Sequence, residues 1–370
     1  MPLQSCTRLG AGWIAGPAQG CVPGEGIAQA AVKGELPEIP FNGVPAAGKL
    51  GGNQMNRLFT RLLSAAAVVG LTAVAPVAPA SAEDINIIVV SHGQASDPFW
   101  SVVKNGVAQA GTDMNVAVDY RAPETFDMVA MAQLIDAAVN QEPHGLIVSI
   151  PDADALGDSI RKAVSAGIPV ISMNSGSDVS ASLGAALHVG QEEYDAGKKA
   201  GEELAAMGGK KGLCVNHEVG NVSLDQRCEG FTAGFGGSVT VLPTTNDPGE
   251  ILSKVKAAIA SDGDIDTIMA LGASLAGEPV VQAVKDSGMI GKINVATFDL
   301  SANFLQSVAD GEAAFAIDQQ QYLQGYLPVV FLANHARYGL MPGGNVPSGP
   351  NLITKDKAAQ VVDLSAKGIR

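Results

Sequence analysis

The chain has 370 residues, which is long enough for about two domains. With 46% apolar and 16% charged residues, its composition is that of a globular protein and excludes a chain that is disordered throughout. Lys and Arg number 23 against 37 Asp and Glu, a formal net charge of -14. Because no basic stripe interrupts this acidic balance, we expect no nucleic-acid partner and no anionic membrane surface as a partner.

The first 82 residues differ in pattern from the rest of the chain. Residues 1–54 are rich in Gly and Pro and lack apolar periodicity, so we predict that they are unstructured. From Met55, two arginines precede an apolar run over 62–75 and the small-residue motif Ala80-Ser81-Ala82, and these three parts are typical of a secretory signal peptide. The apolar run is too short for a membrane anchor. We therefore expect translation from Met55, a signal peptide over 55–82 and export to the periplasm.

After the signal peptide, short β-branched runs alternate with segments of helical period, which indicates parallel sheets covered by helices. In the first array we predict strands at 85–90, 116–120, 145–150 and 168–173 and helices at 100–112, 127–140 and 155–166. In the second array we predict helices at 192–207, 224–235, 250–261, 278–287 and 303–309 and strands at 212–216, 239–242, 267–271, 293–298 and 314–318. A helix at 321–338 and an extended stretch near Leu352 follow. The predicted fold class is α/β, with two doubly wound parallel-sheet lobes.

Residues that directly follow the strands are the functional candidates, because open parallel sheets bind ligands beyond the carboxyl ends of their strands. Two such sheets that face one another would share a single cleft. The candidates are residues 96–100, 149–154, 174–175, 217–227, 246, 272–274, 299 and 318–319. They are mostly Asp, Asn, Gln, Ser, Arg and aromatic residues without a cluster of nucleophiles, a set that suits a hydroxyl-rich small molecule.

Motifs of catalysis and metal binding are missing from the sequence. No phosphate loop, nucleophile elbow or dinucleotide fingerprint occurs. The five histidines are scattered, and His217-Glu218 is not followed by a second His at helical spacing. The acidic segment 262–266 lacks the Gly and Glu positions of a calcium loop. We therefore expect no catalytic residue, no metal and no cofactor.

Two cysteines, Cys214 and Cys228, follow the signal peptide. Export to an oxidising compartment would allow a disulfide between them, closing a loop of about 15 residues. Two buried thiols are equally compatible with the sequence, because spacing alone does not give the distance between the two Cα atoms.

Several short sequence segments resemble those of the periplasmic sugar-binding proteins of ABC importers, especially the ribose-type group. They are SHG (91–93), DPFW (97–100), PDADAL (151–156), IPVISMN (168–174), QRCEGF (226–231), TFD (297–299) and DQQ (318–320). The resemblance extends over residues 83–370. It implies the type I periplasmic binding protein fold, no enzymatic activity, a monosaccharide or polyol ligand, a permease partner in the inner membrane and a monomeric state.

Residue roles in the first lobe follow from this resemblance. Phe99 and Trp100 match aromatic residues that pack on the apolar face of a sugar ring, and Asp97 matches a hydroxyl-binding group. Asn174 matches an amide or acid that binds hydroxyls, and Ser149 matches a polar group beneath it.

The resemblance also implies roles for residues of the second lobe. Arg227 matches a sugar-binding arginine, whose planar fork can donate two hydrogen bonds. Asp299 and Gln319 match an acceptor and an amide, and Phe298 is expected to add a stacking face. Asn246 is a further candidate, at a position where many relatives have an aromatic residue. Residues 272–274 stand where many relatives have an Asn-Asp pair. These two departures leave the particular sugar open.

The resemblance implies a hinge at three crossings, near 189–191, 319–322 and 348–352. The N-terminal lobe would comprise residues 83–189 and 320–348, and the C-terminal lobe residues 190–319 and 349–370. Other functions stay open: the same fold could bind a furanosyl signal or a nucleoside, and an exported hydrolase would need an activated nucleophile or a metal. A regulator's effector domain would carry a DNA-reading helix-turn-helix in place of an export signal.

Overall fold

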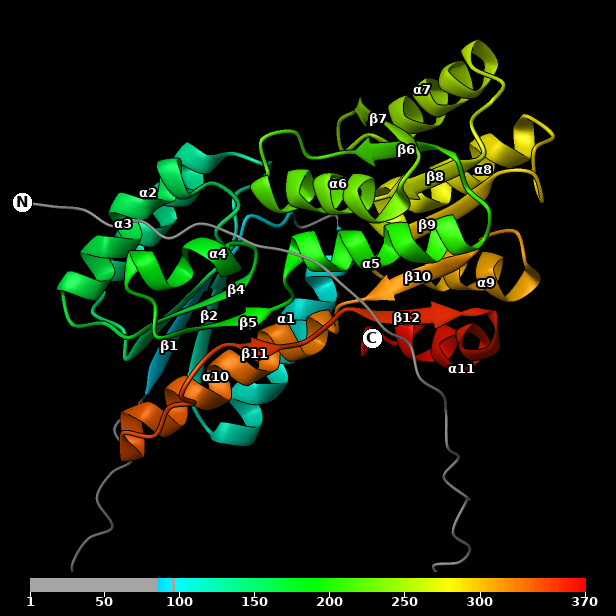
Figure 1. Cartoon of the computed structure of the whole chain (residues 1–370). Helices are drawn as coiled ribbons and strands as arrows, with labels where there is room; N and C mark the ends of the chain where they lie inside the picture. Colours follow the sequence, from blue (N-terminus) through cyan, green and yellow to red (C-terminus); the bar gives the residue numbers. More distant parts are fainter. Residues whose placement is uncertain (1–84, 95–96) are drawn as a thin grey trace, which may run out of the picture. The chain divides into compact units, whose positions relative to one another are not determined.

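The computed structural model describes residues 85–94 and 97–370 (Figure 1). The predictions of an unstructured segment at 1–54 and of a signal peptide at 55–82 lie outside the described residues. Within the described part of the chain, no helix combines the length and the apolar character needed to cross a membrane.

Sheet A has six strands in the order β11-β5-β4-β3-β1-β2, and its neighbouring strands are all parallel. The strands are β1 (Asn86–Val90), β2 (Ala117–Arg121), β3 (Gly145–Val148), β4 (Val170–Asn174), β5 (Leu187–Gly190) and β11 (Val346–Pro347). Its helices are α1 (Pro98–Met114), α2 (Met128–Val139), α3 (Ala153–Ser165), α4 (Ser177–Ser180) and α10 (Gln321–Tyr338).

Both faces of sheet A are covered, which explains why Ile87–Val90 of β1 are all apolar. Side chains alternate between the two faces of a strand. Ile87 and Val89 accordingly belong to a core cluster with residues of α1 and α10, whereas Ile88 and Val90 belong to a cluster with residues of α2 and α3. Helices on both faces leave the carboxyl edge of the sheet as the place for a ligand.

Sheet B also has six strands, in the order β12-β10-β9-β8-β6-β7. They are β6 (Lys211–Asn216), β7 (Ser238–Pro243), β8 (Thr267–Ala270), β9 (Asn294–Phe298), β10 (Phe315–Asp318) and β12 (Asn351–Thr354). Its helices are α5 (Glu193–Ala206), α6 (Val222–Phe235), α7 (Pro248–Ser261), α8 (Glu278–Asp286), α9 (Ala302–Asp310) and α11 (Lys355–Ala366). One edge pair, β10 with β12, is antiparallel, so this sheet departs from the purely parallel prediction.

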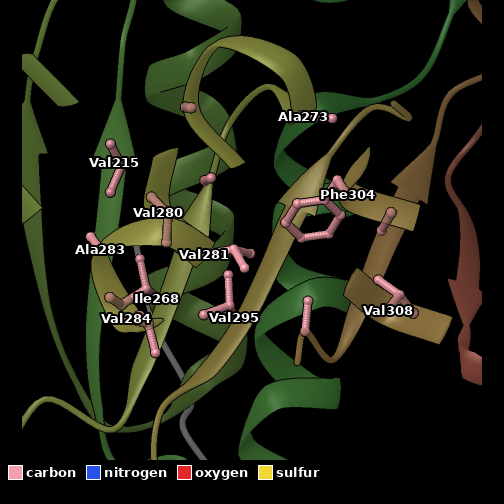
Figure 2. Close-up of a cluster of buried hydrophobic side chains, with 14 of the residues drawn as sticks. Val215, Ile268, Ala273, Val280, Val281, Ala283, Val284, Val295, Phe304 and Val308 are labelled. Carbon is pink, nitrogen blue, oxygen red and sulfur yellow. The ribbon is translucent and has the colours of Figure 1, made fainter. Parts of the chain in front are cut away.

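Two clusters form the core of this lobe. On one face, aliphatic residues such as Val215, Ile268 and Val295 pack against Val280 and Phe304 of the helices (Figure 2). On the other face, α5 and α6 pack against one another and over Phe298 and Cys214. This second face holds the helix that carries Arg227.

Most helices begin at a polar capping residue directly after a strand or its turn. Asp97 and Asn221 are the N-caps of α1 and α6, and their side-chain oxygens accept hydrogen bonds from Phe99 N and Ser223 N, respectively. Such caps satisfy backbone N–H groups that the first helical turn leaves free. Because they follow parallel strands, they also place polar side chains at the carboxyl edges of the sheets.

The chain passes between the two sheets at three places: from β5 to α5, from β10 to α10 and from β11 to β12. The predicted fold class, two doubly wound α/β lobes, is confirmed. Sequence patterns did not indicate the two-residue strand β11, the helix α11 or a π-helical turn at Ala273–Gly277. Each is short or lacks a strong apolar stripe of its own.

Candidate functional site

Residues from both lobes line one cavity. The lining residues are His92, Asp97, Phe99, Trp100, Asn174, His217, Glu218, Asn221, Leu224, Arg227, Leu271, Asp299 and Gln319. Many of them lie at the carboxyl ends of β1, β4, β6, β8, β9 and β10 or within two residues after them. The cavity therefore lies where doubly wound sheets bind ligands.

Seven of the residues predicted for the ligand site line this cavity: Asp97, Phe99, Trp100, Asn174, Arg227, Asp299 and Gln319. Three others lie beside it. Ser149 Oγ bonds His92, Asn246 donates to Glu218 Oε1 over 3.4 Å, and Phe298 is fully buried beneath Arg227. These three support lining residues from behind.

An aromatic wall forms the side of the cavity that belongs to sheet A. The Trp100 ring lies 4.7 Å from that of His92 and 5.1 Å from that of Phe99, edge to face in both cases. A Cβ atom at Gly93 would come within 2.0 Å of Trp100 Cγ, so only glycine leaves room for the indole in this position. The wall offers flat apolar surface to one face of a ligand.

Arg227 faces this wall from α6 and is almost fully buried. Nε donates to Glu193 Oε2 over 2.6 Å, Nη2 donates to Glu193 Oε1 over 3.0 Å, and Nη1 donates to Leu271 O over 3.1 Å. The guanidinium carbon lies 4.5 Å from the centroid of the Phe298 ring. A guanidinium has five N–H donors, and these contacts use three. One donor on each terminal nitrogen is left for a ligand.

Amide and carboxylate groups extend the site from sheet A to sheet B. Asn174 Nδ2 donates to Gln319 Oε1 over 3.3 Å, and Gln319 Nε2 donates in turn to Asp299 Oδ1. Asn174 and Asp299 have φ values of 62° and 68°, in the left-handed region that costs free energy for residues with a side chain. Such strained conformations concentrate at functional sites, where surrounding contacts hold them.

Contacts between residues of the two lobes surround the cavity. Asn221 Nδ2 lies 3.5 Å from His92 Nε2, and Val222 N donates to Pro151 O over 3.0 Å. Further out, Gln226 Nε2 donates to Asp178 Oδ2 over 3.0 Å. A ligand in this cavity would thus be enclosed by both lobes.

Burial controls the charges of the lining. It raises the pKa of Asp97 to about 7 and that of Asp299 to about 6, although Arg227 opposes the effect at Asp299. Burial also raises the pKa of Glu218. Burial, assisted by the positive charge of Arg227, lowers the pKa of His92 to about 3 and that of His217 to about 4. The histidines are therefore neutral at pH 7, and the site is rich in acceptor groups.

These shifts predict how stability depends on pH in the ligand-free protein. Burial also lowers the pKa of His188 to about 4. Below pH 6.5 an unfolded chain therefore takes up protons on His92, His188 and His217, whereas the native protein does not. Stability is consequently lost as pH falls from 6.5 toward 4. The raised pKa values of Asp97 and Asp299 act in the opposite direction, because each native carboxyl binds a proton that the unfolded chain releases above its ordinary value of 3.8, and the raised pKa of Glu218 adds to this effect. We expect a net loss of about 2 kcal/mol between pH 6.5 and pH 5.

Two variants separate the opposing contributions to this pH dependence, measured as the free energy of unfolding in urea at both pH values. His217→Asn should reduce the loss, because one proton-binding group of the unfolded chain is removed. Asp97→Asn should increase it, because a compensating carboxyl is removed. A change in the same direction for both variants would contradict the assignment.

Six lining residues were not singled out from the sequence: His92, His217, Glu218, Asn221, Leu224 and Leu271. Four of them fall within the candidate segment 217–227, and only their packing shows which side chains reach the cavity. His92 lies two residues past β1 and is oriented by Ser149 Oγ, 2.8 Å from Nδ1. Within the described residues, no group of three or more His, Cys, Asp or Glu side chains is arranged to hold a metal ion.

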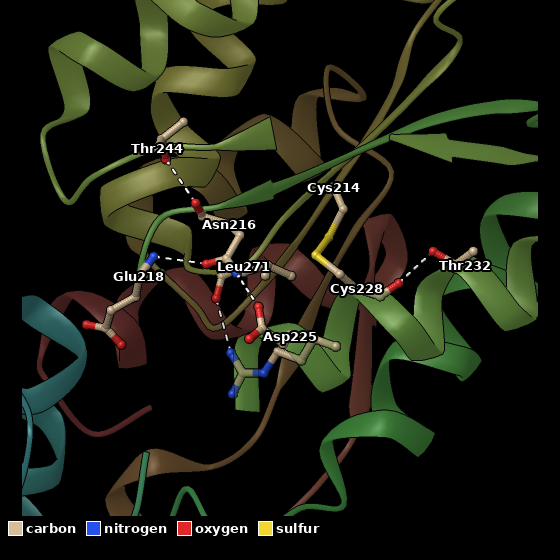
Figure 3. The surroundings of a disulfide bond; sticks show 9 residues. Cys214, Asn216, Glu218, Asp225, Cys228, Thr232, Thr244 and Leu271 are labelled. Carbon is tan, nitrogen blue, oxygen red and sulfur yellow. Dashed lines mark hydrogen bonds between the residues drawn. A yellow bond between two sulfur atoms is a disulfide. The ribbon is translucent and has the colours of Figure 1, made fainter. Parts of the chain in front are cut away.

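Cys214 of β6 and Cys228 of α6 form a disulfide in the structure, with Cα atoms 5.8 Å apart (Figure 3). Cys228 directly follows Arg227, and β6 leads into His217 and Glu218. The bridge therefore joins two elements that both contribute lining residues.

The chain is similar to proteins of known family. A family model described as a periplasmic binding protein domain matches residues 87–340. The chain is similar to a carbohydrate transporter from Acidothermus cellulolyticus, solved in complex with myo-inositol. The identity is 34%, the match covers 77% of this chain and 99% of that one, and the TM-score is 0.74.

Two curated relatives are more distant. The xylose/arabinose-binding protein of Sulfolobus acidocaldarius is 26% identical over 66% of this chain, and the match spans 64% of the length of that relative. The fructose import binding protein of Bifidobacterium longum is 24% identical, with 60% of this chain and 70% of the relative covered. All three are named as binding or transport proteins.

Proposed function

Since the chain belongs to the periplasmic binding protein domain family, we propose that it is an exported, monomeric solute-binding protein without enzymatic activity. It captures a monosaccharide or polyol in the cavity between its lobes and delivers it to the permease of an ABC importer in the inner membrane. The observation that carries the proposal is that Arg227, with two N–H donors left unused by its bonds to Glu193 and Leu271, lines the same cavity as Trp100 and Phe99. The names of the relatives support the same class of ligand.

The two sides of the cavity suit the two kinds of surface on a sugar or cyclic polyol. The apolar C–H face of a ring would pack on Trp100, as apolar groups do on aromatic rings. Hydroxyl groups would accept hydrogen bonds from Arg227 and donate to Asp299 and Asp97. Because a closed cavity excludes water, each hydroxyl left without a partner would cost ~1–3 kcal/mol, and this penalty gives the site its selectivity.

Capture is coupled to movement of the lobes. The segments 190–193, 318–321 and 347–351, where the chain passes between the sheets, act as the hinge. A ligand that contacts both lobes binds the closed arrangement better than an open one and shifts the population toward it. The closed protein then presents one continuous surface to the permease.

Calorimetry with the purified protein tests this proposal. The ligands are myo-inositol, D-xylose, L-arabinose and D-fructose, and adenosine represents the nucleoside alternative. We expect at least one neutral sugar or polyol to bind with one-to-one stoichiometry and a Kd of about 1 μM or below, and adenosine not to bind. Binding of adenosine alone, or of no sugar or polyol, would contradict the proposal.

The aromatic wall gives a second expected result. Trp100→Leu keeps an apolar side chain but removes the flat face, so the affinity for the neutral ligand should fall about tenfold, or ~1.4 kcal/mol. Phe331→Leu is the matched control, because Phe331 of α10 packs on the core of the same lobe and does not line the cavity. Equal losses of affinity in the two variants would show that Trp100 acts only through stability.

A further inference from the structure

Glu193 is a buried carboxylate behind the cavity and is not one of its lining residues. It lies in the first turn of α5 and is 2% exposed. Both of its oxygens accept hydrogen bonds from Arg227, and Gln191 Nε2 adds a bond of 3.0 Å to Oε2. Removing either partner of such a buried pair would leave the other charge uncompensated, which is strongly destabilising.

The packing of α5 on α6 fixes the distance between the two charges. A Cβ atom at Gly197 would lie 2.2 Å from Arg227 O, and one at Gly230 would lie 2.0 Å from Tyr194 O. Only glycine at these two positions allows the helices to approach so closely. The backbone beneath Arg227 is therefore set against the first turns of α5, and Glu193 is held in reach of the guanidinium.

The pairing determines what charge a ligand meets. Among the described residues that line the cavity, Arg227 is the one permanent cation, whereas Asp97, Glu218 and Asp299 are carboxyl groups. Burial works to lower the pKa of Arg227, but the negative charge and hydrogen bonds of Glu193, together with the charges of Asp299 and Glu218, outweigh burial and keep that pKa above its ordinary value. A positive charge that is already compensated offers little attraction to an anion, while its two remaining N–H groups can still bind hydroxyl oxygens.

We propose that Glu193 is a specificity-determining residue that makes the site select neutral sugars and polyols and reject sugar acids. It does so without touching the ligand: it compensates the charge of Arg227 and orients the two free donors toward hydroxyl groups. An anionic ligand then meets no uncompensated positive charge, while any ionised carboxyl group of the lining repels it, and this repulsion gives the selectivity. The inference rests on the proposed function, because it presupposes a hydroxylated ligand in the cavity.

The test compares two probes, myo-inositol and D-glucuronate, by competition calorimetry on the purified protein. Wild type should prefer myo-inositol by at least a hundredfold. In Glu193→Gln, Arg227 loses its hydrogen-bonded counter-charge and should attract the carboxylate more strongly, so the preference should fall at least tenfold. Glu203→Gln is the matched control, since it removes a charge from an exposed residue of the same helix, outside the hinge, and should leave the preference unchanged.

A conservative variant covers the case in which Glu193→Gln fails to fold, which circular dichroism would reveal. Glu193→Asp keeps the charge but withdraws it by one methylene, so the preference should fall by a smaller factor of about three. A preference that stays as in wild type in folded Glu193→Gln or in Glu193→Asp would overturn the inference, as would equal weakening of both probes. Failure of wild type to bind any neutral sugar or polyol would instead refute the proposed function, so the two failures are distinguishable.

Discussion

Arg227→Ala is expected to weaken binding of the neutral ligand about a thousandfold. The variant removes two hydrogen bonds from a charged donor, each worth ~1.5–3 kcal/mol, in a cavity where water cannot replace them. A loss of ~4 kcal/mol corresponds to that factor in the Kd. Arg227→Lys retains the charge beside Glu193 but not the planar fork, and we expect it to weaken binding about a hundredfold.

Calorimetry on folded protein measures these losses, and folding must be checked because Arg227→Ala leaves Glu193 without its partner. Removing one member of a buried ion pair destabilises by ~3–5 kcal/mol. Arg161→Ala is the control, since Arg161 of α3 is exposed and pairs with Asp158 at the surface. A change of less than tenfold in the Kd of Arg227→Ala would exclude Arg227 as a principal ligand contact.

The Cys214–Cys228 bridge is expected to contribute about 3 kcal/mol to the free energy of unfolding. The two cysteines are 14 residues apart, and the chain-entropy model gives this value for a loop of about 15 residues. The double variant Cys214→Ala/Cys228→Ala should unfold at correspondingly lower urea concentration. Ligand affinity should also decrease, because the bridge ties α6, which carries Arg227, to β6.

A reducing agent provides the matched comparison for the disulfide. It should lower the stability of wild type toward that of the double variant and leave the double variant unchanged. Two results together would mean that Cys214 and Cys228 are not bridged. The stability of wild type would not respond to the reducing agent, and a labelling assay of the unfolded chain would find two free thiols.

Local sequence patterns were sufficient to predict the two lobes. Runs such as Ile87–Val90 are apolar because both faces of their sheet are covered, and the polar caps that follow them mark the helix starts. The antiparallel pairing of β12 was not predictable in this way, because strand direction depends on how the chain returns to sheet B after β11.

The general location of the site could be predicted, but not the orientation of each side chain in it. Phe298 ends β9 with its ring turned into the α5–α6 core, whereas the next residue, Asp299, adopts a left-handed φ and faces the cavity. Asn221 lines the cavity opposite His92 only because the two lobes come together there. Glu193 was missed for a related reason: its role depends on contacts with a helix 34 residues further along the chain.

The central claim is that one ligand binds both lobes at once, between Trp100 and Arg227. A crystal structure of the protein grown with the tightest neutral ligand of the panel tests it most directly. We predict density for a single sugar or polyol ring stacked on Trp100, with two of its oxygens within 3.2 Å of Arg227 Nη1 and Nη2. Density on only one lobe, or at a surface away from these two side chains, would contradict the account.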